Sequence, residues 1–269
     1  MDEKTLSAAR RWFLDYAETF RSGKPEDTEP INLKIQHTQR VCKEINDIGK
    51  SLQIGSEDLC LAEMMALLHD IGRFEQYARY RTFADYRSVN HATLGVRILR
   101  NHSPLEALDK GERDLILRVV AYHNRYRVPE GVSGRCAFFS RLLRDADKLD
   151  IWRVVTDYYS QKDGPRDRVV ELDLPNTNHV SREPCADLLA GKIVKLHSMR
   201  SLNDFKVLQM SWVYDVNFPR TFQRIYERGY MEMLRDALPE TAEVSELYAA
   251  VQAYVKEQAG LTMDSTFAP

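Results

Sequence analysis

Apolar residues recur along this chain at the three- and four-residue spacing of amphipathic helices, and no stretch alternates long enough to predict a strand. The pattern therefore predicts an all-α protein. The expected helices are Thr5–Phe20, Ile31–Ile48, Glu57–His69, Asn90–Asn101, Gly111–His123, Gly134–Tyr159, Glu183–His197, Leu202–Arg228 and Thr241–Gln258. Ser56, Asn90 and Thr241 are expected to cap helix N-termini, while Gly49 and Gly229 are expected to end helices.

Stretches rich in Pro, Gly or charge separate these helices, at residues 22–30, 73–89, 125–133 and 162–178. Pro219 falls inside a predicted helix, which should start, kink or break there. None of the breaks is Gly/Ser-rich or long enough to predict an interdomain linker. We therefore expect an N-terminal helix and connector (1–30) packed on a core domain (31–160), with a C-terminal helical extension (161–269) in the same compact unit.

The composition is that of an ordinary soluble protein, with 43% hydrophobic residues, 29% charged residues and a formal net charge of −2. This charge gives no global reason to bind nucleic acid or an anionic membrane. The N-terminus lacks the apolar segment of a signal peptide, and no apolar run approaches the roughly 20 residues that span a membrane. Four widely spaced cysteines predict reduced, mostly buried thiols, so we expect a cytoplasmic protein.

Four histidines interrupt helix faces that are otherwise apolar and should be buried. They are His37, His69, His91 and His123, each on a different predicted helix. A single one would more often be a hydrogen-bonded core histidine than a ligand, but four unpaired buried groups would each cost about 1–3 kcal/mol. A shared metal ion would satisfy all four at once. His102, His179 and His197 have polar neighbours and are expected to be solvated.

Asp70 directly follows His69, and adjacent residues of an α-helix point about 100° apart. The two can therefore meet one metal ion only near a helix end, and Gly72 is expected to give the chain the freedom to turn there.

A second acidic run, residues 144–150, offers three carboxylates that helical phase separates. Asp147 shares an apolar face with Leu143 and is the predicted inward ligand. Asp150, at the edge of that face, is expected to support a ligand. Asp145 is expected on a solvated face, in a surface ion pair.

The order His37, His69-Asp70, His91, His123, Asp147 resembles the HD-domain superfamily of metal-dependent phosphohydrolases. The resemblance spans roughly residues 35–155 and is strongest in His-Asp-Ile-Gly-Arg and Asp-Ala-Asp-Lys-Leu-Asp. It implies an HD-domain helical bundle in which the first His, the doublet and the last Asp hold one ion. It also implies that His91 and His123 mark a binuclear site, with Asp70 bridging the ions.

By this resemblance we expect a cytoplasmic hydrolase, a phosphatase or phosphodiesterase, in which a metal-activated water cleaves a phosphoester. Nitrogen and oxygen ligands without thiolate favour one or two ions of Fe, Mn, Ni, Co or Zn, with Mg a weaker match. The same ligand set also resembles the mixed-valent di-iron oxygenases of the superfamily, and this alternative stays open. A non-catalytic nucleotide-sensing module is a third interpretation, which the complete ligand set disfavours. The chain departs from the HD-GYP phosphodiesterases because it has no Gly-Tyr-Pro.

The expected substrate is a small phosphoester with an attached ring, such as a nucleotide, because Arg alternates with aromatic residues beside the doublet and after His123. Arg73 is the predicted catalytic and phosphate-side cation beside Asp70. Lys148, Tyr77 and Arg125 are further predicted substrate-binding residues, Lys148 the weaker because its helical phase is more exposed. Aromatic residues of the C-terminal helices are expected in the core, in a cap over the site or in a homodimer contact; they are Trp212, Tyr214, Phe218, Phe222 and Tyr226.

Overall fold

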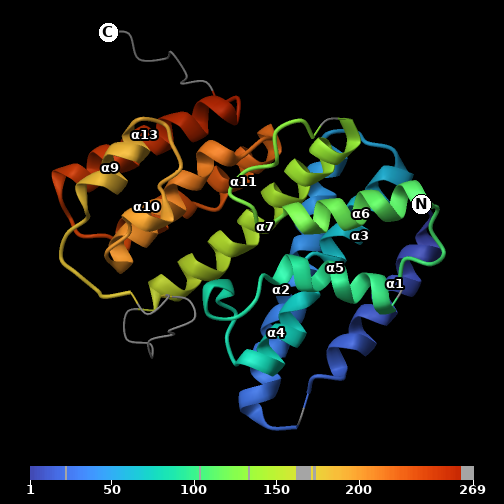
Figure 1. The fold of residues 1–269 in the computed structure, drawn as a ribbon. Coiled ribbons are helices and arrows are strands. Elements are labelled where there is room, and N and C mark those ends of the chain that lie inside the picture. The colour runs from blue at the N-terminus through green and yellow to red at the C-terminus, as the bar shows by residue number, and fades with distance from the viewer. Residues whose placement is uncertain (22, 103, 133, 162–170, 172–173, 262–269) are drawn as a thin grey trace. The chain divides into compact units, whose positions relative to one another are not determined.

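The computed structural model describes all residues except 22, 103, 133, 162–170, 172–173 and 262–269. The described residues form helices and contain no β-strand, so the all-α prediction is confirmed (Figure 1). None of the described helices is both long enough and apolar enough to cross a membrane. The chain divides into two compact units, residues 1–150 and 151–269, and that the extension packs in one unit with the core domain stays a prediction. The predicted connector 162–178 lies partly outside the described residues.

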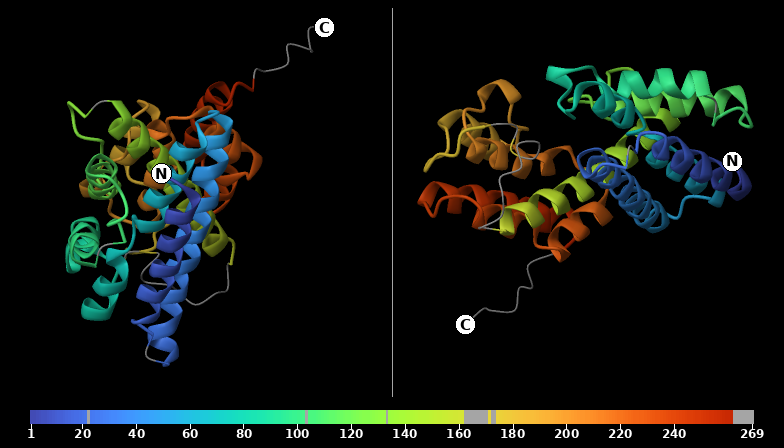
Figure 2. Two further views of the ribbon diagram at one scale, coloured as in Figure 1. Left: turned by 90° about the vertical axis from the view of Figure 1, so that its right-hand side faces the viewer. Right: turned by 90° about the horizontal axis from the view of Figure 1, so that it is seen from below.

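The unit of residues 1–150 is a helical bundle built around α3 (Ser56–Leu68), which contacts α1 (Glu3–Glu18), α2 (Pro25–Ser51) and α6 (Lys110–Tyr122). Two views show α1 and α2 as long helices side by side (Figures 1 and 2). A second layer follows, in which α4 (Gly72–Tyr80) packs on α5 (His91–His102) and α5 packs on α6. The 27-residue helix α7 (Gly134–Ser160) begins in this unit.

Helix α3 is apolar on every side over its second half, where all residues from Leu61 to Leu68 except Glu63 are buried. A helix that is apolar all round packs in the middle of a protein rather than on its surface. Its C-terminal end therefore delivers the His69-Asp70 doublet to the interior.

Gly72 is required for close packing rather than for conformational freedom, which corrects the sequence interpretation. A Cβ on Gly72 would lie 2.2 Å from the carbonyl oxygen of His91 and 2.8 Å from the backbone nitrogen of Gly95. Helix α4 can thus approach α5 this closely only because Gly72 lacks a side chain. The prediction of a connector at 73–89 is wrong for its first half, where α4 lies.

Three other predicted helix boundaries differ from the structure, and one predicted cap is confirmed. Helix α2 starts at Pro25, six residues earlier than expected; Pro25 occupies the first turn, where proline is favoured, and Pro30 lies inside the helix. Gly49 continues α2 instead of ending it, and it allows close packing on α3, since a Cβ there would meet the Leu59 side chain at 2.8 Å. The N-cap of α3 is Gly55 and not Ser56. Asn90 does cap α5, accepting from the Thr93 N–H at 2.9 Å.

The unit of residues 151–269 contains α9 (Arg182–Leu189), α10 (Leu202–Ser211), α11 (Pro219–Glu227), α12 (Tyr230–Asp236) and α13 (Ala242–Gln258). Pro219 starts α11, and Gly229, in the left-handed conformation, separates α11 from α12. The predicted helix Leu202–Arg228 is divided into α10, the 3₁₀-helix η3 (Trp212–Asp215) and α11, and the predicted helix Glu183–His197 ends at Leu189. Within this unit Trp152 is fully buried and donates to the Gln209 carbonyl at 3.0 Å.

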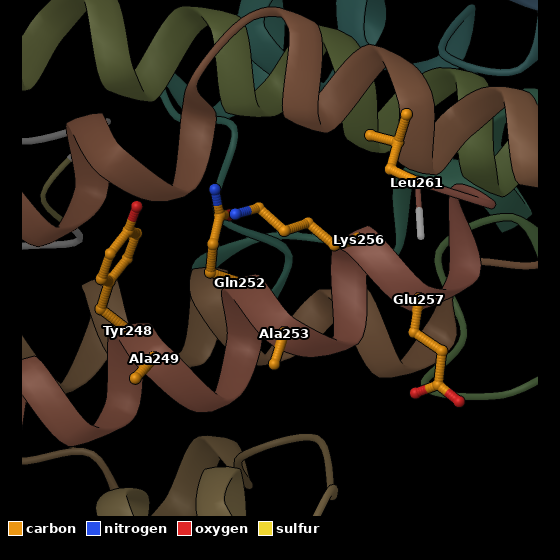
Figure 3. A pocket seen from close by; sticks show the side chains of 7 residues that line it. All are labelled: Tyr248, Ala249, Gln252, Ala253, Lys256, Glu257 and Leu261. Atoms are coloured by element: carbon orange, nitrogen blue, oxygen red, sulfur yellow. The ribbon is translucent and has the colours of Figure 1, made fainter. Parts of the chain in front are cut away.

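A groove of about 540 Å³ runs along α13 (Figure 3). Its walls include Tyr248, Gln252 and Lys256, and none of its lining residues is a histidine or cysteine. Phe222 is buried in this unit, whereas Tyr226 is 39% exposed. The predicted cap and homodimer roles of these aromatics stay predictions.

Candidate metal centre

The four predicted inward histidines are all buried, at 0–6% exposure, and converge in the unit of residues 1–150. His37 lies in the middle of α2. The other three lie at helix ends, where the chain turns: His69 follows α3, His91 begins α5 and His123 follows α6. His102, His179 and His197 are exposed, as predicted.

Each of these four rings has its Nδ1 held by an acceptor. His69 and His123 reach the carbonyl oxygens of Ala66 and Val120, three residues earlier, both at 2.7 Å. His37 Nδ1 lies 2.7 Å from Asp150 Oδ2, and His91 Nδ1 lies 2.8 Å from Asp85 Oδ2. An acceptor at Nδ1 fixes the tautomer and leaves the Nε2 lone pair for a metal ion.

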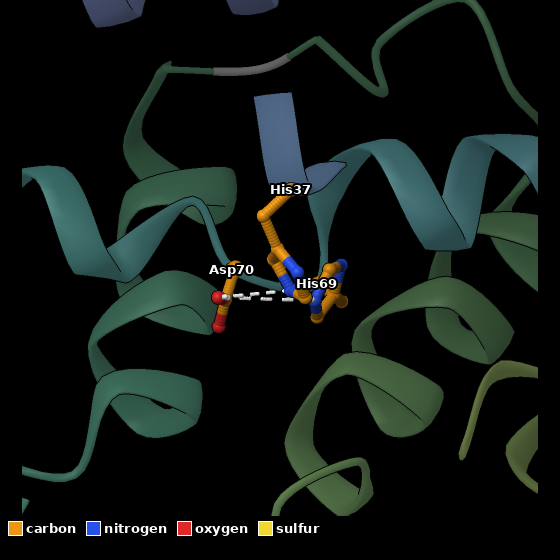
Figure 4. Close-up of side chains that lie close together, drawn as sticks. All are labelled: His37, His69 and Asp70. Carbon is orange, nitrogen blue, oxygen red and sulfur yellow. Dashed lines mark hydrogen bonds and ion pairs between the residues drawn. The ribbon is translucent and has the colours of Figure 1, made fainter. Parts of the chain in front are cut away.

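The Nε2 atoms form two groups around Asp70. In the first, His37 and His69 lie 3.3 Å apart, at 3.6 and 3.8 Å from Asp70 Oδ2 (Figure 4). In the second, His91 and His123 lie 2.9 Å apart, at 3.3 and 3.7 Å from Asp70 Oδ1. Each group has the spacing of a three-ligand metal site. One Asp70 oxygen faces each group, so Asp70 would be the shared ligand if both groups held an ion.

Asp147 joins the first group, with Oδ1 at 3.2 Å from His37 Nε2 and 3.7 Å from His69 Nε2. Its side chain is 17% exposed while those of the histidines are at most 8% exposed, so the group reaches solvent beside Asp147. Asp150 accepts from Arg40 Nη2 at 3.0 Å as well as contacting His37. It therefore anchors a ligand from behind.

The donor set fits metal ions. Two nitrogen ligands bound at right angles to one ion, each at about 2.1 Å, lie about 3.0 Å apart. The observed Nε2 separations of 2.9 and 3.3 Å are close to this distance between two nitrogen ligands of one ion. Where two neutral rings face each other, their buried lone pairs repel, and an ion bound between them would remove that cost.

The histidines of the site differ in their protonation near pH 7. Burial lowers the pKa of His69 and of His91 to about 4, so both rings are neutral near pH 7. Burial disfavours the charged form of His37 too, but Asp147 and Asp150 outweigh it and raise its pKa to about 9. Burial likewise opposes ionisation of Asp70, yet Lys34 and His69 hold its pKa well below the usual range.

The predicted substrate-binding residues are placed differently from one another. Arg73 lies beside Asp70, with Nε 3.4 Å from Oδ1, and its Nη1 donates to Gln76 and Asp85 at 3.0 Å. Tyr77 is half-buried on α4, and Arg125 is exposed over the ring of Tyr122.

Two statements about α7 are wrong. Asp145 is fully buried and Lys148 is only 9% exposed, although both were expected on a solvated face. Helical phase predicts one solvated face only when a helix lies at the surface, whereas every residue from Leu142 to Asp150 except Asp147 is buried.

Sequence reasoning missed several residues that hold the site in place. Asp85, in the turn η1 (Asp85–Arg87), accepts from Gln76 and Asn124 as well as contacting His91. Arg144 is buried and donates to the carbonyls that follow α6, that of His123 at 3.0 Å. Lys34 and Arg40 lie one helical turn on either side of His37, so helical phase could have found them. No pattern marks a loop residue such as Asp85.

Comparison with protein families agrees with this geometry. Residues 35–152 match the family model of the HD domain, which characterises a superfamily of metal-dependent phosphohydrolases. The comparisons with curated proteins and with solved structures gave no match. The chain therefore contains an HD domain at residues 35–152, whose buried His/Asp clusters are consistent with a metal site.

Proposed function

We propose that this protein is a metal-dependent phosphohydrolase that cleaves a phosphomonoester or phosphodiester of a nucleotide. One observation carries the proposal: two three-ligand groups share Asp70, with one oxygen facing each. Ions bound there would activate a water for attack on phosphorus and neutralise the phosphoryl oxygens.

The residues around the clusters provide the other requirements of this chemistry. Asp150 and Asp85 fix the rings of His37 and His91 from behind, so the ligands need little reorganisation when ions bind. Arg73, tethered through Nη1, places a guanidinium beside Asp70 for phosphate oxygens. The exposed edge of Asp147 provides an approach from solvent.

Support for a nucleotide comes from half-buried aromatic rings near the first cluster. Tyr77 and Phe83 have ring centroids 5.0 Å apart, and Lys34 Nζ lies 5.1 Å from the centre of Phe83 while also contacting Asp70. A phosphate at Asp70 would thus have an aromatic surface within reach of its attached base. The expected partner is a small-molecule phosphoester.

The test combines metal analysis with a panel of nucleotides and chromogenic phosphoesters. We expect phosphate release that stops on chelation and returns with a divalent ion. Asp70→Ala should lower kcat by at least about 10³-fold, because both clusters lose their shared ligand. Asp58→Ala, at the exposed start of the same helix α3, is the matched control and should keep activity.

Two outcomes would contradict the proposal. A metal-loaded protein inactive on the whole panel would count against phosphoester hydrolysis. Stoichiometric iron with a mixed-valent spin signal on partial reduction, and oxygen-dependent turnover, would favour the di-iron oxygenase instead.

A further inference from the structure

Lys34 is a cation at the edge of the first cluster. It lies on α2 one turn before His37, immediately before the residues that match the HD domain. Its Nζ donates to Asp70 Oδ2 at 2.8 Å, and its side chain is 16% exposed. The ammonium therefore stands between the buried ligands and solvent.

Lys34 and Arg73 approach opposite oxygens of Asp70 but are held differently. Arg73 is anchored through Nη1 to Gln76, to the Phe83 carbonyl and to Asp85. Lys34 has a flexible four-carbon stem, and its ammonium rests on Asp70 and faces the ring of Phe83. Of the two cations, Lys34 can move with little loss of other contacts.

An ion held by His37, His69 and Asp70 must bind the same Oδ2 atom that Lys34 contacts. Two cations on one carboxylate oxygen repel each other strongly where water is excluded. Ion binding should therefore displace the ammonium from Oδ2, while its stem keeps it beside the ion and at the solvent-exposed side.

We propose that Lys34 is a substrate-binding residue whose ammonium, displaced from Asp70 by the ion, binds an oxygen of the substrate phosphate. The inference rests on the proposed phosphohydrolase function. It assigns to one residue two opposite effects: Lys34 weakens ion binding and strengthens phosphate binding. A lysine that only supported the fold would act on both in the same direction.

The test measures Mn²⁺ binding and inorganic phosphate binding to the Mn²⁺-loaded protein by calorimetry, without using hydrolysis. Lys34→Gln removes the charge but keeps a donor for Asp70, which protects folding. We expect Mn²⁺ to bind at least about threefold more tightly in this variant, and phosphate about tenfold to a hundredfold more weakly. Lys34→Arg should restore phosphate binding. Lys43→Gln, exposed on the same helix, should change neither constant.

Weakening of both constants in Lys34→Gln, or unchanged phosphate binding, would overturn the inference. So would wild-type protein that binds Mn²⁺ but no phosphate. A protein that shows the opposite effects on the two constants yet hydrolyses no phosphoester would overturn the proposed function and leave the assignment of Lys34 intact.

Discussion

The two units of this protein bury polar residues in different ways. In residues 151–269, Asp204 is fully buried and accepts from the backbone N–H groups of Ser181, Arg200 and Ser201, at 2.7–3.1 Å. In residues 1–150, Asp70 is 4% exposed, and the Nε2 atoms of four histidines lie 3.3–3.8 Å from its oxygens. The Nδ1 atoms of these four rings already have acceptors. Burial alone therefore does not distinguish structural from functional carboxylates.

The difference lies in whether the protein itself satisfies the buried group. Asp204 completes a capping box at the start of α10, so its hydrogen bonds are closed within the fold. Lys34 already donates to Asp70, but the Nε2 atoms of the surrounding histidines face one another, and a bound ion would satisfy them. The comparison predicts that the first carboxylate governs stability and the second governs ion binding.

The largest expected effect is on stability, in Asp204→Ala. Loss of the capping carboxylate leaves several buried N–H groups without an acceptor and should destabilise the protein by about 3 kcal/mol. Urea denaturation measures this, and Asp236→Ala, at the exposed last residue of α12, should change stability little. Mn²⁺ affinity should stay as in wild type, and a loss of affinity would contradict a purely structural role for Asp204.

The next effect is on ion binding, in Asp85→Ala. Without this acceptor the His91 ring loses its fixed tautomer, so affinity for one of two ions should fall about 10- to 100-fold. Equilibrium dialysis should then show one ion bound tightly and one bound weakly. Asp150→Ala should weaken the other ion in the same way, and equal loss of both ions in either variant would argue against separate clusters.

A smaller effect, on pH dependence, belongs to the C-terminal unit. Burial lowers the pKa of Lys206 to about 8 from its usual 10.5, although it donates to the Ala237 carbonyl at 2.6 Å. The folded state therefore loses this proton before the unfolded state does, and the penalty for burying the charge disappears as pH rises from 8 to 10.5.

Wild type should gain stability relative to Lys206→Met over that window, by on the order of 1 kcal/mol. Paired denaturation curves at several pH values measure the gain. A constant difference between the two proteins would show that Lys206 titrates alike in both states.

The smallest expected effect is on substrate affinity, in Arg125→Ala. Arg125 is exposed over Tyr122, close to His123 in sequence, so its loss should raise KM about threefold and leave stability unchanged. Steady-state kinetics on the best nucleotide of the panel would show this. An unchanged KM would place Arg125 outside the substrate site.

Much of the fold could be predicted because helix formation and helix phase are local properties. The stripe of His37 with Val41 and Ile45 is visible in the sequence, and all three side chains are buried. The predicted breaks at Pro219 and Gly229 are confirmed, whereas those at Gly49 and at residues 73–80 are wrong. Gly49 lies inside a helix at a close contact with Leu59, and α4 forms in a stretch whose charge is typical of a loop, so local composition did not reveal either.

By itself, the sequence determined the helical class and the four buried histidines, since these follow from spacing along single helices. It did not determine the place of Asp147, which is the only residue from Leu142 to Asp150 that is not buried. Only the tertiary structure decided that one Asp70 oxygen faces each histidine pair, that Asp85 and Asp150 hold the rings, and that Lys34 contacts Asp70. The physical reason is the separation along the chain of the residues that interact. Periodicity reports which side of a helix is buried, whereas ligand geometry depends on atoms that approach from helices far apart in the chain.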